Sequence, residues 1–195
     1  LASAHQSTSL DAQPARNVPI AAPANNSFEE PGALPGTAAG WTVGGPVADQ
    51  VLVSNEGPFD GAHCLRVECQ GQAGWAVSDP FPRPRTGRLS VAVWLRVDDP
   101  QRQPALRLGL ESVNSTAEYY RCAPLGAQST VAQVTDEWSE YIIPVTDLPA
   151  DVTSLRIRFD ISGPATVWID KVQAYDLWFS DSERVELLKL ITTAD

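Results

Sequence analysis

Apolar and polar residues alternate along most of the chain. In "RLSVAVWLRV", residues 88–97, every second position from Leu89 to Val97 is Leu or Val, and the positions between them carry Ser, Ala, Trp and Arg. The segments "ALRLGLES" (105–112) and "LRIRFDI" (155–161) repeat this pattern. Successive side chains of a β-strand point to opposite faces, so a period of two predicts strands that each bury one face.

Shorter strands are predicted around these segments, because short apolar runs are broken there by Gly, Pro, Asn and Asp. They lie at Val51–Ser54, Cys64–Cys69, Trp75–Ser78, Tyr119–Ala123, Tyr141–Val145 and Ala165–Leu177. The stretch "ISGPAT", residues 161–166, is typical of a turn and predicts that the last two long strands form a hairpin. No helical periodicity separates the strands, so the pattern indicates an all-β fold, an antiparallel β-sandwich or jelly roll.

Both ends of the chain depart from the strand pattern. Residues 1–24 are rich in Ala, Ser, Gln and Pro without periodicity, which predicts a disordered tail or linker ahead of a sandwich module at 25–179. In residues 180–195, "SDSERVELLKLI" carries a capping box from Ser180 to Glu183 and then an apolar run, which predicts a C-terminal α-helix. A single domain rarely ends on so apolar a helix without using it. We therefore expect the helix to lead into a further domain rather than to dock on the sandwich.

Composition narrows the function classes. The formal net charge of −10 argues against nucleic-acid binding, whose affinity comes largely from neutralisation of phosphates by Lys and Arg. No run approaches the ~20 apolar residues of a membrane span. The sequence starts at Leu1 and contains no Met, which suggests a processed or excised fragment from which any signal peptide has been removed. We therefore expect a secreted, cell-surface or periplasmic location.

The three cysteines, Cys64, Cys69 and Cys122, show no metal-type spacing such as C-x-x-C. Cys64 and Cys69 lie five positions apart on one predicted strand, so they point to opposite faces and should not pair with each other. We interpret the cysteines as unpaired residues that pack as small hydrophobic side chains. A disulfide from Cys122 to either of the others stays open.

Motifs for catalysis are sparse. The chain has two histidines, His5 in the tail and His63 at the start of a strand, and no Ser is accompanied by nucleophile-elbow glycines. Neither a phosphate-binding loop nor a dinucleotide fingerprint is present, and the glycines are scattered turn residues. A glycosidase built on two carboxylates stays open, because Asp and Glu are plentiful and their separation is not visible in a sequence. We expect a protein that is not an enzyme.

A set of polar and aromatic residues lies opposite the apolar side of the predicted strands. Its members are Trp94, Arg96, Arg107, Glu111, Arg156, Arg158 and Asp160, with Tyr119, Tyr120 and Arg121 added according to the register. A flat aromatic ring suits the C–H face of a pyranose, and Arg and carboxylate groups form planar, bidentate hydrogen bonds with vicinal hydroxyls. The set therefore predicts a glycan-binding sheet face. Two alternatives stay open: a solvated face joined by cross-strand ion pairs with Trp94 under a loop, and an interface with a neighbouring domain.

Asp170 is a carboxylate on a strand that is otherwise largely apolar. Regular alternation over Ala165–Leu177 puts Trp168, Asp170 and Val172 on one face, which looks like the face turned toward the core. An isolated ionised carboxylate is costly to bury and needs a cation, a metal or several hydrogen-bond donors. The residues alone leave open a metal ion, an Arg partner, or backbone N–H groups at a β-bulge.

Six short motifs occur in a familiar order along the chain. They are "NNSFEEPG" (25–32), "GW" (40–41), "FDGAHCLRV" (59–67), "GRLSVAVWLRV" (87–97), "EWSEYIIPV" (137–145) and "VWIDKVQAYDL" (167–177). Together they resemble the calcium-containing jelly-roll carbohydrate-binding modules appended to xylanases and cellulases, which share the galactose-binding-like sandwich. The resemblance covers about Asn25 to Leu177.

The resemblance implies a structural Ca²⁺ near the ends of the first and last strands. Glu29 and Asp170 match the family's acidic ligands, and Asp60 or the Gly61 carbonyl matches a further ligand. Lys171 stands where the family usually has a second Asp. The family's sugar site lies either on the concave sheet face or in the loops, so its ligand residues are not carried over to this chain.

Together, the pattern and the resemblance predict a non-catalytic carbohydrate-binding module of an exported multidomain protein. Such a module binds a polysaccharide or other glycan on a polar sheet face and holds neighbouring domains of the same polypeptide near it. The alternative is a structural or protein-interaction β-sandwich domain without a sugar site, which the crowding of Arg and acidic residues favours slightly.

Overall fold

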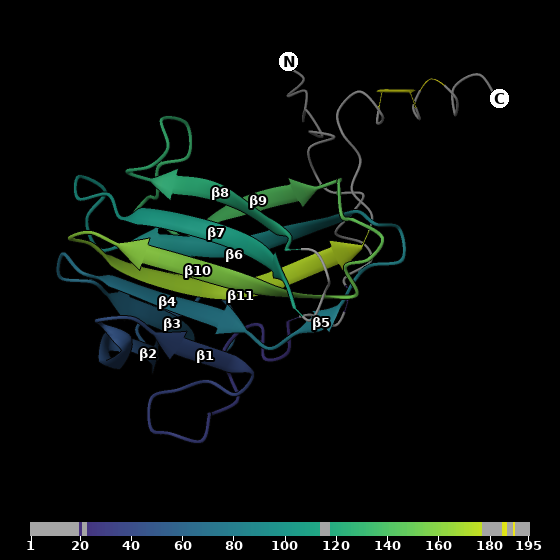
Figure 1. Ribbon diagram of the computed structural model, residues 1–195. Helices are drawn as coiled ribbons and strands as arrows, with labels where there is room; N and C mark the ends of the chain where they lie inside the picture. Colours follow the sequence, from purple (N-terminus) through teal and green to yellow (C-terminus); the bar gives the residue numbers. More distant parts are fainter. Residues whose placement is uncertain (1–19, 21–22, 114–117, 177–184, 187–188, 190–195) are drawn as a thin grey trace, which may run out of the picture.

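The alternating segments form strands, and the strands build the two layers of an antiparallel β-sandwich (Figure 1). The computed structural model describes residues 20, 23–113, 118–176, 185–186 and 189. One layer, the β10 sheet, has the order β1 (Trp41–Gly44), β4 (Ala73–Ser78), β10 (Ser154–Ser162), β7 (Ala105–Ser112) and β8 (Tyr120–Gly126), and β5 (Phe81–Pro82) pairs with the start of β10. The other layer, the β11 sheet, has the order β2 (Val51–Ser54), β3 (Cys64–Glu68), β11 (Thr166–Asp176), β6 (Leu89–Val97) and β9 (Ser139–Val145). A 3-10 turn, η2 (Ala48–Gln50), precedes β2.

The inward-facing residues of both sheets meet in one hydrophobic core. On β6, alternate residues are at most 1% exposed, namely Leu89, Val91, Val93, Leu95 and Val97. On β10, alternate residues are at most 2% exposed, namely Leu155, Ile157, Phe159 and Ile161. Burial of each such side chain contributes about 1.5–3 kcal/mol. The predicted all-β sandwich and the faces predicted for these strands are confirmed.

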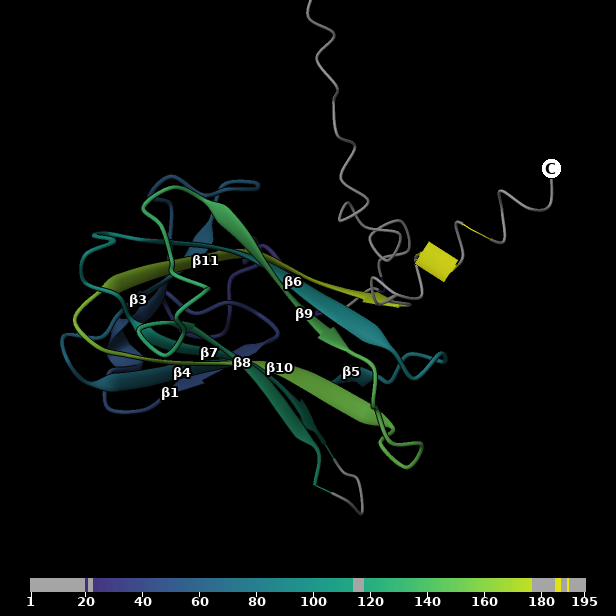
Figure 2. The same cartoon turned by 90° about the horizontal axis from the view of Figure 1, so that it is seen from above.

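The predicted hairpin between the last two long strands is wrong. β10 and β11 lie in different sheets, so the turn between them carries the chain from one layer of the sandwich to the other (Figure 2). Gly163 in this turn has a φ of 108°, which residues with a Cβ rarely adopt, and its carbonyl accepts a hydrogen bond from Gly71 N at 2.9 Å. The same turn residues can join strands within a sheet or between sheets, because in both cases the strands turn an apolar face toward one core.

A β-bulge in β11 changes which residues face the core. The register with β6 shifts between Asp170 and Gln173, and Lys171 adopts a φ of 46°. Odd-numbered residues of β11 pack in the core before the bulge and even-numbered residues do so after it. The prediction that Trp168, Asp170 and Val172 all share the core-facing side is therefore wrong for Trp168 and Asp170, because the bulge reverses the alternation.

The described part of the N-terminal segment contacts the sandwich. Ile20 N donates to Ala174 O at 3.1 Å, and Gln173 Nε2 donates to Ile20 O at 2.9 Å. Residues 1–19 and 21–22 of the predicted tail lie outside the described residues.

Most of the C-terminal helix predicted at 180–195 lies outside the described residues, and the three residues that are described there are too few to support the helix. In the part of the chain that the structure describes, no helix has the length and apolar character needed to span a membrane.

The three cysteines are free, as predicted, but only Cys64 and Cys69 pack as small hydrophobic side chains. Cys64 and Cys69 are fully buried, and burial raises the pKa of Cys64 to about 12 and that of Cys69 to about 11. Cys122 is exposed on β8, in the opposite sheet from β3. The two buried thiols therefore behave as small hydrophobic side chains rather than as nucleophiles.

Candidate functional site

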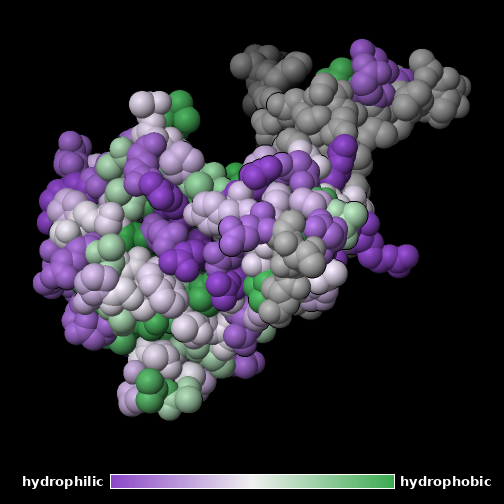
Figure 3. All heavy atoms as spheres, viewed as in Figure 1, coloured by the Kyte–Doolittle hydropathy of each residue, from purple (hydrophilic) through white to green (hydrophobic). Residues whose placement is uncertain are grey.

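The outer face of the β10 sheet gathers most of the predicted site residues. Residues that are directly opposite in an antiparallel pair share a face, so the register defines three rows across β4, β10, β7 and β8. The rows are Trp75–Asp160–Arg107, then Arg158–Gly109–Cys122, and then Arg156–Glu111–Tyr120. Figure 3, which views the molecule from this side, shows hydrophilic side chains gathered over β7 and β10.

Two ion pairs lie on this face, which we call the β10 face. Arg158 Nε donates to both carboxylate oxygens of Asp160, at 2.9 and 3.1 Å. Arg156 Nε donates to Glu111 Oε1 across the β10–β7 pair at 2.5 Å. The hydrogen bond that Arg158 donates to Asp160 raises the pKa of Arg158 further above its usual range, against the opposing effect of burial. These contacts confirm that cross-strand and same-strand ion pairs join the polar face.

Trp75 gives the β10 face an aromatic surface. Its ring packs over Gly44 of the neighbouring edge strand, where any Cβ would clash with it. The Arg158 guanidinium carbon lies 5.0 Å from the ring centroid, a cation–π contact. Gly44 thus allows the indole to lie against the sheet, and Arg158 fixes it from the side of β10.

A hollow of about 390 Å³ opens at one end of the β10 face. Its lining combines an aromatic ring with charged and amide groups and includes Gly45, Pro46, Trp75, Arg107, Gln128 and Asp160. Arg107 Nε donates to Gln128 Oε1 at 2.9 Å, which joins the strand to the loop after β8. The hollow is therefore a polar depression with one flat apolar wall, on a rigid sheet.

The structure divides the predicted ligand-binding set. It brings together on the β10 face Arg107, Glu111, Tyr120, Arg156 and Arg158. It places Trp94 and Arg96 on β6, in the opposite sheet, and Tyr119 in the core. The Tyr119 hydroxyl donates to Asp147 Oδ1 at 2.9 Å, so the core tyrosine has its partner inside the protein.

Two side chains of the hollow that could contact a ligand, Trp75 and Gln128, were not in the predicted set. Trp75 stands in a segment that was predicted as a strand, and its side of that strand could have been assigned from the alternation with the buried Ala76. Gln128 belongs to the loop after β8, and no periodic signal in the sequence places a loop residue over a sheet. Side-by-side pairing of β4 and β10, which puts Trp75 beside Asp160, is a property of the topology.

The outer face of the β11 sheet, the β11 face, carries an aromatic cluster of a different kind. Phe59 stacks on Trp94 with a centroid distance of 3.7 Å and an angle of 12°. The Arg96 guanidinium lies 4.0 Å from the Trp168 ring centroid and 5.2 Å from that of Trp138. These rings cover one another, which agrees with the alternative in which a loop covers Trp94.

Loop residues 55–60 are fastened over this cluster by three anchors. Trp138 Nε1 donates to Gly57 O at 2.9 Å, and Arg96 Nη2 donates to Glu56 O at 2.5 Å. The third anchor is Asp170, whose Oδ2 accepts hydrogen bonds from the backbone N–H groups of Phe59 and Asp60 at 2.8 and 3.0 Å. The loop is therefore part of the packed β11 face.

Asp170 is fully buried, and its partners are backbone donors at a bulge. Besides the two loop N–H groups, Lys171 N donates to Asp170 Oδ1 at 2.7 Å. Burial raises the pKa of Asp170 to about 6, and these backbone hydrogen bonds oppose that rise. Of the three kinds of partner for Asp170 that the sequence left open, this arrangement matches backbone N–H groups at a β-bulge.

The predicted calcium ligands have partners within the protein. Glu29 Oε1 accepts the N–H groups of Ala62 and His63 at 2.8 and 2.9 Å, and Glu29 Oε2 lies 3.1 Å from His63 Nδ1. Asp60 Oδ2 lies 3.7 Å from Lys171 Nζ. Across the described ranges, no three His, Cys, Asp or Glu side chains are grouped to hold a metal ion. The donor set as it stands does not fit the six to eight oxygens that Ca²⁺ takes, and the calcium site stays a prediction.

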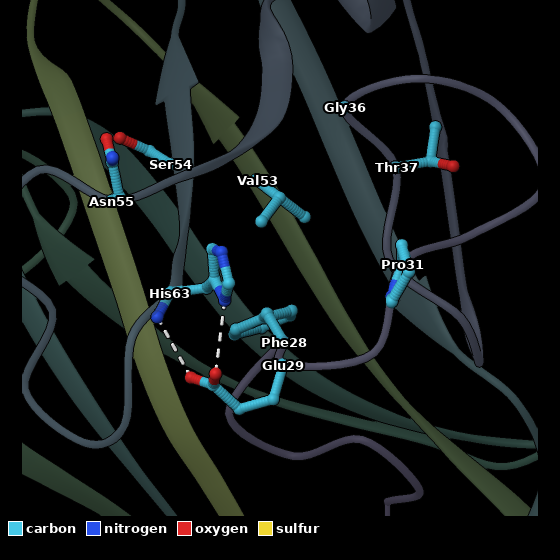
Figure 4. A pocket seen from close by; sticks show the side chains of 9 residues that line it. All are labelled: Phe28, Glu29, Pro31, Gly36, Thr37, Val53, Ser54, Asn55 and His63. Carbon is cyan, nitrogen blue, oxygen red and sulfur yellow. Dashed lines mark hydrogen bonds and ion pairs between the residues drawn. The ribbon is translucent and has the colours of Figure 1, made fainter.

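A second hollow, of about 530 Å³, lies beside the Glu29–His63 pair (Figure 4). Figure 4 shows the His63 ring held by Glu29 on one side, with its other edge directed away from the carboxylate. Ser54 lines the same hollow, but its Oγ accepts a hydrogen bond from Glu56 N at 3.1 Å. Among the described residues, no hydroxyl or thiol hydrogen-bonds to His63, so the geometry gives no activated nucleophile here.

Comparisons with known proteins support the fold. Neither the family models nor the curated proteins give a match to the sequence. Among solved structures, a family 61 carbohydrate-binding module in complex with β-1,4-galactotriose is 14% identical with a TM-score of 0.56, over 80% of this chain and 97% of that chain. The xylan-binding domain CBM22-1 of Paenibacillus barcinonensis Xyn10C is 16% identical with a TM-score of 0.50, over 80% of this chain and 94% of that chain. The resemblance to jelly-roll carbohydrate-binding modules is therefore confirmed at the level of the fold.

Proposed function

We propose that this chain is a non-catalytic module that binds a glycan on the β10 face. The observation that carries the proposal is the hollow where the Trp75 ring, Arg107 and Asp160 meet on one rigid sheet. A pyranose ring presents an apolar C–H face and a rim of hydroxyls, so it needs a flat apolar surface edged by planar polar groups. The β10 face offers both at one place.

Different residues of the hollow would contact different parts of the sugar. The Trp75 indole would pack against the C–H face of one sugar residue. Arg107 and Gln128 would donate hydrogen bonds to hydroxyl or ring oxygens of the sugar. The Asp160 carboxylate would accept hydrogen bonds from sugar hydroxyls. Because the depression is shallow and open to water, we expect dissociation constants in the micromolar to millimolar range.

The shared fold supports this proposal, since the solved relatives in fold include modules described with a galactotriose and as xylan-binding. The proposal includes an exported multidomain protein in which the module keeps a partner domain near its polysaccharide. A non-catalytic role is consistent with a His63 ring that is bonded to a carboxylate rather than to a nucleophile within the described chain.

The second candidate is a structural or protein-interaction domain without a sugar site. It is favoured by the two ion pairs of the β10 face, in which Asp160 and Glu111 already have Arg partners. A face whose polar groups satisfy one another has fewer groups to offer a ligand. The hollow at Trp75 and Arg107 distinguishes the candidates, because its polar groups are only partly used.

An array of neutral and acidic plant and algal polysaccharides tests the proposal. We expect binding to at least one class, and we expect Trp75→Ala to weaken it at least tenfold. Trp94→Ala is the matched control, since it removes the same side chain from the opposite sheet and should leave the affinity of the folded protein unchanged. An array without binding to any class would favour the protein-interaction candidate.

A further inference from the structure

Charges on the β10 face pair one to one, except at Arg107. Asp160 forms an ion pair with Arg158, and Glu111 forms one with Arg156. Arg107 lies directly opposite Asp160 on the neighbouring strand, but Asp160 accepts its hydrogen bonds from Arg158. The face therefore holds three Arg residues and two acids, which leaves one positive charge at the hollow.

The guanidinium of Arg107 also has donors to spare. Its Nε donates to the neutral side chain of Gln128 at 2.9 Å. Among the described residues, its two terminal nitrogens have no protein partner within hydrogen-bond distance, and the residue is exposed. A guanidinium presents its donors in a planar fork that matches a carboxylate or a sulfate oxygen pair. The hydrogen bond to Gln128 holds the Nε side of the Arg107 guanidinium and so orients its two terminal nitrogens.

We infer, on the basis of the proposed function, that the glycan carries an anionic substituent that pairs with Arg107. The substituent is the carboxylate of a uronic acid or a sulfate ester, and each of these presents at least two anionic oxygens to the fork. Trp75 lies in the same row of side chains, so a sugar ring on the indole brings its substituent toward Arg107. Arg107 is thus the residue that selects charged over neutral sugars.

The charge of the whole chain limits how many such groups the glycan carries. The formal net charge is −10, which repels a densely charged polyanion at long range. A single unpaired cation at the hollow attracts one anionic group at short range, where a direct contact is least screened. The inference is therefore a glycan with isolated anionic groups on an otherwise neutral backbone.

Matched pairs of polysaccharides test the inference. The full chain is titrated calorimetrically with glucuronoxylan and with the same polymer after carboxyl reduction, and likewise with furcellaran, a sparsely sulfated galactan, and its desulfated form. We expect the acidic member of at least one pair to bind at least tenfold more tightly. A preference within the first pair identifies a carboxylate as the anion, and one within the second pair identifies a sulfate.

Two variants assign the preference to its residue. Arg107→Gln should reduce the ratio within that pair to about one, because it weakens the binding of the acidic member far more than that of the neutral member. Arg85→Gln removes the same charge from the turn after β5, at the other end of β10, and should keep the ratio. Equal binding of both members by a protein whose binding depends on Trp75 would overturn the inference and leave the proposed function standing. A protein that binds none of the four polymers, and nothing on the wider array, would overturn both.

Discussion

The two outer faces of the sandwich use similar residues in opposite ways. On the β11 face, Phe59 lies flat on Trp94 and Arg96 lies against Trp168. The aromatic rings there are therefore covered by other side chains of the protein. On the β10 face, Trp75 packs over Gly44 beside a hollow, and its neighbours are polar. The comparison teaches that aromatic and Arg residues on a sheet are open to a ligand only where no loop covers them.

The largest expected effect is on the stability of the β11 face. Asp170→Ala removes the acceptor of three backbone N–H groups inside a buried site, so we expect it to lower the free energy of unfolding by about 3 kcal/mol. Urea denaturation measures this loss. Asp160→Ala on the β10 face is the control and should cost less than about 1 kcal/mol, because its ion pair is partly exposed. Equal losses would mean that the loop is not anchored by Asp170.

A pair of tryptophan variants separates packing from binding. Trp94→Ala should lower the free energy of unfolding by about 2 kcal/mol, since it removes the surface on which Phe59 stacks. Trp75→Ala should cost about 1 kcal/mol or less, because its ring lies on the outer face and not in the core. Thermal unfolding of both variants beside the wild type gives the order. The reverse order would assign the structural role to Trp75 and remove the distinction between the faces.

A smaller effect is expected from pH. Burial raises the pKa of Asp170 to about 6, whereas an unfolded Asp titrates near ~3.9, so between these values the folded state binds the extra proton. Stability from this group therefore increases as pH falls from 7 toward 5, by about 1.4 kcal/mol, because about one pH unit of this window lies below the folded-state pKa and each unit is worth about 1.36 kcal/mol. The difference in melting temperature between wild type and Asp170→Asn, followed from pH 7.5 to 5, isolates this group. A difference that does not change with pH would show that Asp170 keeps an ordinary pKa.

The smallest expected effect is that of a chelator. The carboxylates of Glu29 and Asp170 already accept backbone N–H groups, so we expect EDTA to change the melting temperature by less than about 1 °C. Differential scanning calorimetry with and without Ca²⁺ measures it. A clear fall on chelation, with bound calcium in elemental analysis, would instead establish the calcium site that the sequence resemblance implies.

The sequence predicted the strands well because their inward residues are uniformly apolar, as on β6 and β10. It left a bulge at Asp170 as one of three possibilities, since the left-handed conformation of Lys171 is seen only in the packed strands of the sheet. The separation of the predicted ligand-binding residues onto two faces also depends on the packed sheets rather than on the sequence pattern. Arg96 and Arg107 look alike along the chain, and only the strand order puts them on opposite faces of the sandwich.

The central claim is that ligand binding belongs to the β10 face, and chemical-shift mapping tests it most directly. An amide NMR titration with the tightest-binding oligosaccharide should shift resonances of β4, β7 and β10 around Trp75, Arg107 and Asp160. Resonances of loop 55–60 and of Trp94 on the β11 face should stay in place. Shifts concentrated at Phe59, Trp94 and Trp138, with the β10 face unchanged, would contradict the account.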